Sequence, residues 1–122
     1  MNRKNLTRNF YQDEFTCKCG CGLNNISIEL VEELQKVRED YGCPMTVTSG
    51  VRCPIWNKAC GGSANSSHLI GLAVDISIDD AVLRHRFIRT VLELGWQRIG
   101  LAKSFIHLDI DLNKTNPVIW TY

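Results

Sequence analysis

Two histidines and one aspartate, His68, Asp75 and His107, are the residues whose types and spacing could do chemistry in this chain of 122 residues. Imidazole nitrogen and carboxylate oxygen are both donors that Zn²⁺ accepts. Three protein donors leave one coordination position for water, which distinguishes a catalytic zinc site from a four-ligand structural site. The three residues therefore predict a catalytic zinc centre, provided that the fold brings them together.

Asp75 carries the strongest single signal of the three, because it lies in a mostly apolar run. Val74 and Ile76 flank it, and a buried carboxylate needs a hydrogen-bonding partner, a cation or a metal. A lone histidine is more often an ordinary surface or core residue. Asp109 follows His107 by two residues and shares its side of an extended strand. It could therefore accept a hydrogen bond from a metal-binding ring and orient it.

Two helices must help to position these residues. Ser27 is a suitable N-cap for a helix that runs to about Tyr41. A second helix, capped by Asp79 or Asp80, is expected to end near Leu94. Both segments carry apolar residues at helical spacing, so each should bury one side in a core.

Short strands complete the expected fold. They are expected at residues 45–49, 72–78, 97–101, 105–110 and 117–122, the last at a sheet edge. The stretch from residue 50 to 67 is expected to be a long loop, which in compact domains is often functional. Residues 1–25 are expected to be irregular. These elements predict one α+β domain over residues 1–122, with a small antiparallel sheet packed against two main helices.

Composition and charge favour a soluble globular protein. Hydrophobic residues make up 44% and charged residues 22%, and the formal net charge is +1. A net charge so near zero gives no general attraction to nucleic acid or to an anionic membrane. No apolar run has the roughly 18 residues of a membrane-spanning helix. Because no apolar stretch follows the N-terminal positive charges, we expect no secretory signal and a protein that is cytoplasmic as synthesised. We also expect a monomer.

The cysteines are numerous for a cytoplasmic chain of this length. They are Cys17, Cys19, Cys21, Cys43, Cys53 and Cys60. A reducing compartment favours free thiols over disulfides. The alternating Cys-x-Cys-x-Cys run could bind a metal through soft thiolates, but it lacks the Cys-x-x-Cys pairs of common zinc sites. A structural or incidental role is therefore favoured, with a redox or metal-sensing role as the weaker alternative.

The pattern around the candidate ligands extends in both directions along the chain. It comprises Ser49-Gly-Val-Arg52, Asn57, Gly61-Gly62, Ser67-x-His-x-x-Gly-x-Ala-x-Asp75 and His107-x-Asp109. In this order the residues resemble the zinc D-Ala-D-Ala carboxypeptidases, a family that includes L-Ala-D-Glu endopeptidases and phage endolysins of the hedgehog/DD-peptidase fold. The resemblance covers roughly residues 12–120, and the cysteine-rich opening resembles small phage-borne members.

The resemblance implies a zinc-dependent peptidase that hydrolyses peptidoglycan stem peptides, either as a carboxypeptidase or as an endolysin-like endopeptidase. It assigns the zinc ligands to His68, Asp75 and His107. Arg52 would face the substrate and stabilise developing negative charge, and Ser49 and Ser67 would contact the substrate. Such a protein would reach the cell wall through phage lysis machinery.

One position departs from the family pattern. Well-studied members carry an acidic residue three positions before the last histidine, and this chain has Ser104 there. Serine cannot act as a general base of suitable pKa without help. Asp109, Asp111 or another carboxylate could replace it, but the motif places none of them, so the general base is unassigned. The alternative is a non-catalytic zinc-containing module that binds cell-wall material or another protein.

Overall fold

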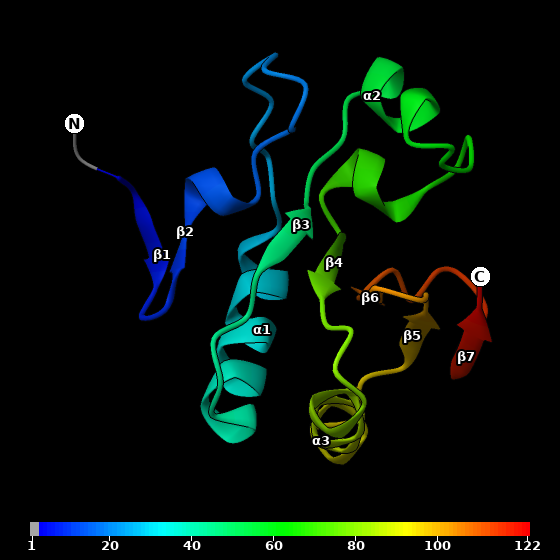
Figure 1. Ribbon diagram of the computed structural model, residues 1–122. Helices are drawn as coiled ribbons and strands as arrows, with labels where there is room; N and C mark the ends of the chain where they lie inside the picture. Colours follow the sequence, from blue (N-terminus) through cyan, green and yellow to red (C-terminus); the bar gives the residue numbers. More distant parts are fainter. Residues whose placement is uncertain (1–2) are drawn as a thin grey trace.

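The computed structural model describes residues 3–122, in which a five-stranded sheet carries two helices on one face (Figure 1). The strands are β3 (Val47–Ser49), β4 (Ala73–Ser77), β5 (Arg98–Leu101), β6 (Phe105–Asp109) and β7 (Val118–Thr121). Their order in the sheet is β3-β4-β6-β5-β7. Neighbours run antiparallel except β5 and β7, which are parallel. The α+β fold with a small, mostly antiparallel sheet is confirmed.

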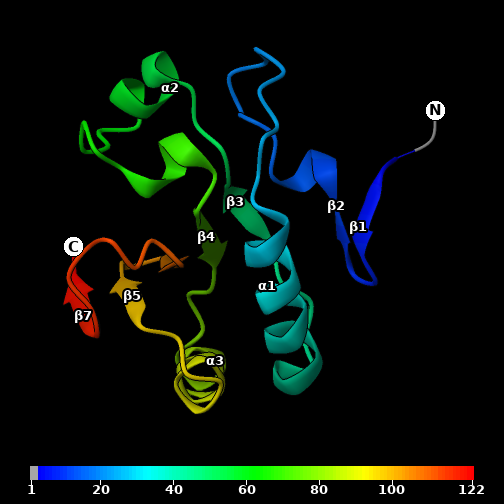
Figure 2. The same ribbon diagram turned by 180° about the vertical axis from the view of Figure 1, so that it is seen from behind.

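The two main helices begin and end close to the expected residues. Helix α1 (Ile28–Tyr41) starts after Ser27, whose hydroxyl accepts a backbone N–H of the first turn at 3.3 Å. Helix α3 (Ala81–Glu93) starts after Asp80, whose carboxylate accepts a backbone N–H at 2.9 Å. The two helices lie side by side in both views (Figure 2). Within the described residues, no helix is both long and apolar enough to cross a membrane.

Alternation along the central strands gives the sheet two different faces. Side chains at even positions of β4 and β6 point toward α1 and α3 and form the core with them. The fully buried members of this core include Leu30, Leu34, Val74, Ile76, Phe87, Ile106 and Leu108. The odd positions Asp75, His107 and Asp109 therefore lie on the opposite face. Asp75 and His107 are direct cross-strand partners, so their side chains emerge next to each other.

The N-terminal segment is more ordered than the sequence predicts. It forms β1 (Asn5–Thr7), β2 (Phe10–Tyr11) and a 3-10 turn η1 (Gln12–Glu14), whereas an irregular segment was expected. Phe10 and Phe15 are buried with ring centroids 5.7 Å apart. Burial of these two rings fixes a segment whose strands are too short to show a periodic pattern.

The expected loop from residue 50 to 67 also contains helical structure. Helix α2 (Pro54–Ala59) occupies its first half, and the 3-10 turn η2 (Ser67–Ile70) begins at its end. Pro54 lies in the first turn of α2, where a missing backbone N–H costs nothing. Six residues are too few to reveal a helical apolar period. In Figure 1, α2 lies at the end of the sheet opposite α3, close to the segment that leads into β4.

Candidate active site

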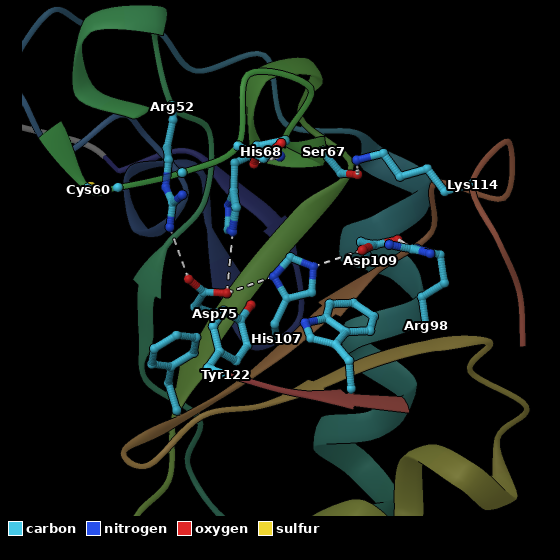
Figure 3. A pocket seen from close by; sticks show the side chains of 16 residues that line it. Arg52, Cys60, Ser67, His68, Asp75, Arg98, His107, Asp109, Lys114 and Tyr122 are labelled. Carbon is cyan, nitrogen blue, oxygen red and sulfur yellow. Dashed lines mark hydrogen bonds and ion pairs between the residues drawn. The ribbon is translucent and has the colours of Figure 1, made fainter. Parts of the chain in front are cut away.

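His68, Asp75 and His107 converge on the sheet face opposite the core (Figure 3). One donor atom of each residue lies within 4.8 Å of the others. Asp75 Oδ1 is 3.3 Å from His68 Nε2 and 2.9 Å from His107 Nδ1. The three residues are only 2%, 4% and 6% exposed in chain order. The structure thus brings together residues that lie up to 39 positions apart (107 minus 68).

A tight turn aims His68 at the strand that carries Asp75. Gly71 ends η2 with φ of 72°, in the left-handed region that favours glycine. A side chain at this position would also collide with the backbone carbonyl of Asn25. The glycine between the histidine and the aspartate is therefore required by conformation and by space. It allows the chain to reverse from η2 into β4 within a few residues.

The proton positions of the two rings follow from their outer partners. His68 Nδ1 lies 2.7 Å from the carbonyl oxygen of Gly50, which can only accept, so this nitrogen carries the proton of a neutral ring. His107 Nε2 lies 2.7 Å from Asp109 Oδ2 and carries its proton for the same reason. The lone pairs of His68 Nε2 and His107 Nδ1 then both point at Asp75 Oδ1. Two lone pairs and an anionic oxygen facing one another fit a cation, and this donor set suits Zn²⁺.

The pKa values of the same groups reflect this concentration of charge. Burial alone would raise the pKa of Asp75, but hydrogen bonds with the His107 and His68 rings, formed when a proton rather than a metal lies between ring and carboxylate, lower it to about 2. Burial alone would lower the pKa of His107, but hydrogen bonds to Asp109 and Asp75 raise it above its usual range. Both carboxylates are therefore ionised at neutral pH. Protons and a metal ion compete for the rings between them.

Arg52 is fixed beside this centre by three acceptors. Its Nη2 donates to Asp75 Oδ2 at 3.1 Å, its Nε donates to Ser49 Oγ at 2.9 Å, and its Nη1 donates to Asn57 Oδ1 at 3.3 Å. The side chain is only 11% exposed. The hydroxyl of Ser49, a predicted substrate contact, is occupied by the guanidinium. Ser49 therefore helps to hold Arg52 in place, and its contact with substrate stays a prediction.

Asp109 lies behind His107 with both oxygens engaged. Oδ2 faces His107, while Oδ1 accepts from Arg98 Nε at 2.7 Å and from the backbone N–H of Asp111 at 3.1 Å. Burial alone would raise the pKa of Asp109, but the hydrogen bond from His107 and the bond from Arg98 lower it. A carboxylate with a lowered pKa and no free oxygen is a weak proton acceptor. Its contacts instead orient the His107 ring.

Ser67 and Asp111 form a second polar group at the cavity. Ser67 Oγ donates to Asp111 Oδ2 at 2.8 Å and accepts from Lys114 Nζ at 2.9 Å. Lys114 Nζ also lies 3.7 Å from Asp111 Oδ2. Among the described residues, Ser67 and Lys114 line the cavity and Asp111 does not. Ser67 therefore presents its hydroxyl beside a positive charge that sequence reasoning missed.

These groups surround an open cavity of about 490 Å³. Its wall includes Trp120 of β7 and Tyr122, the residue after β7, neither of which the sequence singled out. The Trp120 ring is 5.3 Å from the His107 ring and packs over Gly100, where any side chain would collide with it. A glycine opposite an aromatic residue on paired strands is the signal that could have revealed this wall. This pairing can be recognised only once the register of β5 and β7 is known.

Ser104 lies outside the cavity lining. It is exposed in the turn between β5 and β6, and its carbonyl oxygen accepts the backbone N–H of Ile78 at 3.1 Å. Among the described residues, the acidic side chains that line the cavity are those of Asp75 and Asp109. The position that is acidic in well-studied relatives therefore contributes no carboxylate here.

Comparison with known proteins agrees with this geometry. The model of the family described as peptidase M15 matches residues 8–109. The comparison with curated proteins gave no match. The matched region contains Arg52 and all three converging residues, whereas β7 lies beyond it. Because the match spans most of the chain and includes the whole candidate metal centre, the protein belongs to the peptidase M15 family of zinc-dependent metallopeptidases.

Proposed function

We propose that the protein is a zinc-dependent peptidase that hydrolyses peptidoglycan stem peptides. The observation that carries the proposal is the convergence of two histidine ring nitrogens and one carboxylate oxygen beside a fixed arginine in an open cavity. His68 Nε2, Asp75 Oδ1 and His107 Nδ1 would hold the ion. Bound Zn²⁺ would supply a water of lowered pKa and polarise the scissile carbonyl.

Arg52 is proposed to stabilise the negative charge that develops on the carbonyl oxygen. Its three hydrogen bonds fix the guanidinium before substrate arrives, so little reorganisation is needed during the reaction. Ser49 and Asn57 act through Arg52 as positioning residues. Removing one preorganised donor of this kind typically lowers kcat by about 10²–10³.

Proton transfer is proposed to proceed without a dedicated carboxylate base. Asp75 and Asp109 are the acidic residues of the cavity, and both are engaged by histidine and arginine. The proton of the attacking water would therefore leave to solvent through the open cavity, and the departing amine would take its proton from the same solvent. Tyr122 lines the same wall, and burial and the charge of Asp75 raise the pKa of its phenol. Tyr122 thus stays protonated at neutral pH and is suited to donate a hydrogen bond to substrate.

The charges of the cavity support an anionic peptide as substrate. Among the residues that the structure describes, Arg52, Arg98 and Lys114 line it together with two carboxylates. Arg98 is held by Asp109, and Lys114, which donates to Ser67 and to the carbonyl of Asn65, keeps 27% of its side chain exposed at the cavity. Stem peptides carry free carboxylates, which Lys114 could pair with.

Cleavage of defined muropeptides tests the proposal. Purified, zinc-loaded protein is incubated with intact stem peptides, and the products are identified by mass spectrometry. Release of D-Ala identifies a carboxypeptidase, and a cut after L-Ala identifies an endopeptidase. Chelator-treated protein and the His107→Ala variant should give no product. Absence of product with the zinc-loaded protein, while a relative with the acidic residue cleaves, would contradict the proposal.

The second candidate function is a non-catalytic zinc module that binds cell-wall peptides. The exposed Ser104 in place of the acidic residue, together with the engaged oxygens of Asp109, favours it. The Ser104→Glu variant separates the two functions. A large gain of hydrolysis over an inactive wild type supports the binding module, and efficient wild-type cleavage eliminates it.

A further inference from the structure

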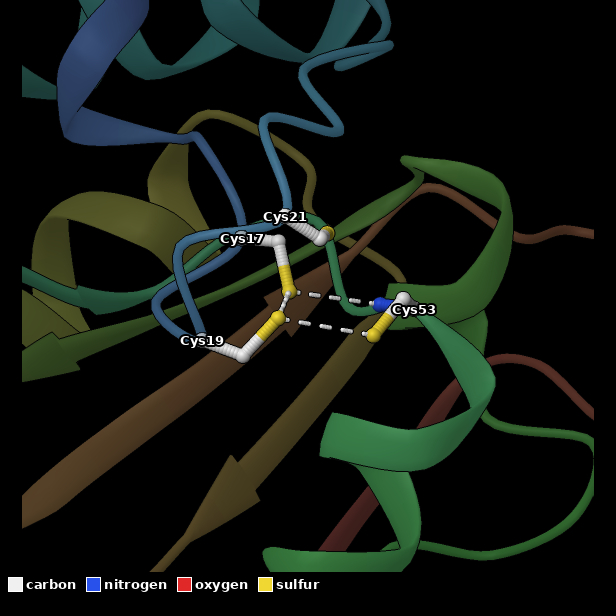
Figure 4. Close-up of side chains that lie close together, drawn as sticks. All are labelled: Cys17, Cys19, Cys21 and Cys53. Carbon is white, nitrogen blue, oxygen red and sulfur yellow. Dashed lines mark hydrogen bonds between the residues drawn. The ribbon is translucent and has the colours of Figure 1, made fainter.

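Four cysteines form a second cluster of metal-type donors, separate from the His68 centre (Figure 4). Cys17, Cys19 and Cys21 come from the N-terminal segment, and Cys53 comes from the residue before α2. Their four Sγ atoms all lie within 4.8 Å of one another. We propose that these four side chains bind one structural zinc ion as thiolates. The inference rests on the thiols alone and is independent of the proposed peptidase activity.

Two of the six sulfur separations are close to those of a tetrahedral site, and the other four lie within 4.8 Å. A zinc–sulfur bond of about 2.3 Å places neighbouring sulfurs of a tetrahedron about 3.8 Å apart. Cys17 Sγ and Cys19 Sγ are 3.4 Å apart, and Cys19 Sγ and Cys53 Sγ are 3.7 Å apart. A disulfide would need about 2.05 Å, and all six cysteines are free. Four sulfur donors leave no position for water, which is the structural type of zinc site.

The local backbone gathers the three alternating cysteines. Alternate side chains of an extended strand share a side but lie nearly 7 Å apart. Here Gly20 and Gly22 adopt φ of 90° and 86°, and the chain turns back on itself. The backbone N–H of Cys17 donates to the carbonyl of Leu23 at 2.8 Å and closes the loop. The turns therefore bring the sulfurs to one point.

Backbone donors already face two of the sulfurs. The N–H of Cys53 points at Cys17 Sγ at 3.4 Å, and the N–H of Trp56 points at Cys53 Sγ at 3.4 Å. Sulfur of a neutral thiol is a weak acceptor, whereas a thiolate bound to metal is stabilised by such donors. The first of these bonds also joins the N-terminal loop to the start of α2. An ion at this point would lock a junction that the backbone has already formed.

Cobalt(II) titration of the reduced, metal-free chain tests the inference. The His68, Asp75 and His107 centre contains no sulfur, so thiolate-to-cobalt charge-transfer absorption can come only from cysteines. We expect two cobalt ions per chain, one of which produces this absorption. The Cys53→Ser variant should lose the absorption and bind one ion. The double variant Cys43→Ser, Cys60→Ser is the matched control and should retain both, because these thiols lie outside the cluster.

A measurement on the unmodified chain covers the case in which Cys53→Ser does not fold. Cys19, Cys21 and Cys60 are all exposed, so burial alone gives them similar access to an alkylating reagent. Zinc-loaded protein should show Cys60 modified and the cluster cysteines protected, with the protection lost on adding chelator. One metal ion per chain without charge-transfer absorption would overturn the inference. Alkylation of Cys19 and Cys21 as fast as Cys60 in zinc-loaded protein would do so as well.

Discussion

Replacement of Asp109 by asparagine tests whether the carboxylate behind His107 controls metal binding. Asp109 Oδ1 accepts two donors, Arg98 Nε at 2.7 Å and the backbone N–H of Asp111 at 3.1 Å. Oδ2 accepts one donor, His107 Nε2 at 2.7 Å. Asparagine has a single oxygen, and two donors hold it on the Arg98 side. Its NH₂ group must then face His107.

The expected effect follows from this reversal of polarity. When the NH₂ group of the introduced asparagine donates to His107 Nε2, that nitrogen must present a lone pair. The single proton of the neutral His107 ring then moves to Nδ1, the atom that faces Asp75 Oδ1. The metal must then displace this proton. Loss of an outer carboxylate typically weakens metal affinity by about 10–100-fold, or roughly 1.4–2.7 kcal/mol. Because asparagine inverts the hydrogen bond as well as removing the charge, we expect about 100-fold.

The assay measures competition between the protein and a chromophoric chelator for cobalt. It follows the cobalt ion whose binding adds no thiolate-to-cobalt absorption, which is the ion at the His68, Asp75 and His107 centre. Asp79→Asn is the matched control, because Asp79 is exposed between β4 and α3 and undergoes the same chemical change. Its affinity should equal that of the wild type. Equal affinity of Asp109→Asn and wild type would refute the assignment of proton positions. Equal weakening by both variants would show a general effect of charge instead.

Three further predictions concern pH, Arg52 and Gly71. In metal-free protein, the pKa of Asp75 of about 2 against an ordinary 3.8 contributes roughly 2 kcal/mol of stability above about pH 4. This contribution should be lost as the pH falls toward 2, and denaturant titrations of the wild type and Asp75→Asn measure it. The raised pKa of His107 acts in the opposite direction, since its stabilisation is full below about pH 6.5 and declines as the pH rises through the raised value. Arg52→Lys should lower kcat/KM for muropeptides by about 10²–10³ with unchanged zinc content, because one ammonium cannot replace three directed donors; an unchanged rate would contradict this role. Gly71→Ala should cost about 2 kcal/mol or more, since roughly 1–2 kcal/mol of left-handed strain is joined by a backbone collision. Gly95→Ala, with φ of 84° and open space, isolates the strain and should cost less in the same denaturant titration.

The parts of the fold that the sequence predicted are those fixed by local chemistry. Ser27 and Asp80 cap α1 and α3 through their own side chains, and capping is a property of a few neighbouring residues. The alternation of β4 is equally local, because it follows from period two. That alternation also placed Asp75 and His107 on a shared face once their strands paired.

The parts that the sequence missed depend on contacts between distant segments. Helix α2 and the β1–β2 pair are too short for a periodic signal, and burial of aromatic rings or a capping residue determines them. Trp120 and Tyr122 become cavity residues only through the parallel pairing of β7 with β5. Cys53 likewise joins the other thiols only because the N-terminal segment folds back against the start of α2.

The adjacency of Arg52 and Cys53 has a structural consequence for the candidate site. Arg52 reaches Asp75 and Asn57, while the next residue reaches the Cys17 loop through both its backbone N–H and its sulfur. Consecutive side chains of an extended segment point to opposite sides, so one short stretch serves both donor clusters. A rigid ion at the cysteines would restrict the backbone that carries the guanidinium. With an ion bound at the cysteines, the cysteine-rich N-terminus and Arg52 would form one mechanically connected unit, although they lie more than 30 positions apart in sequence.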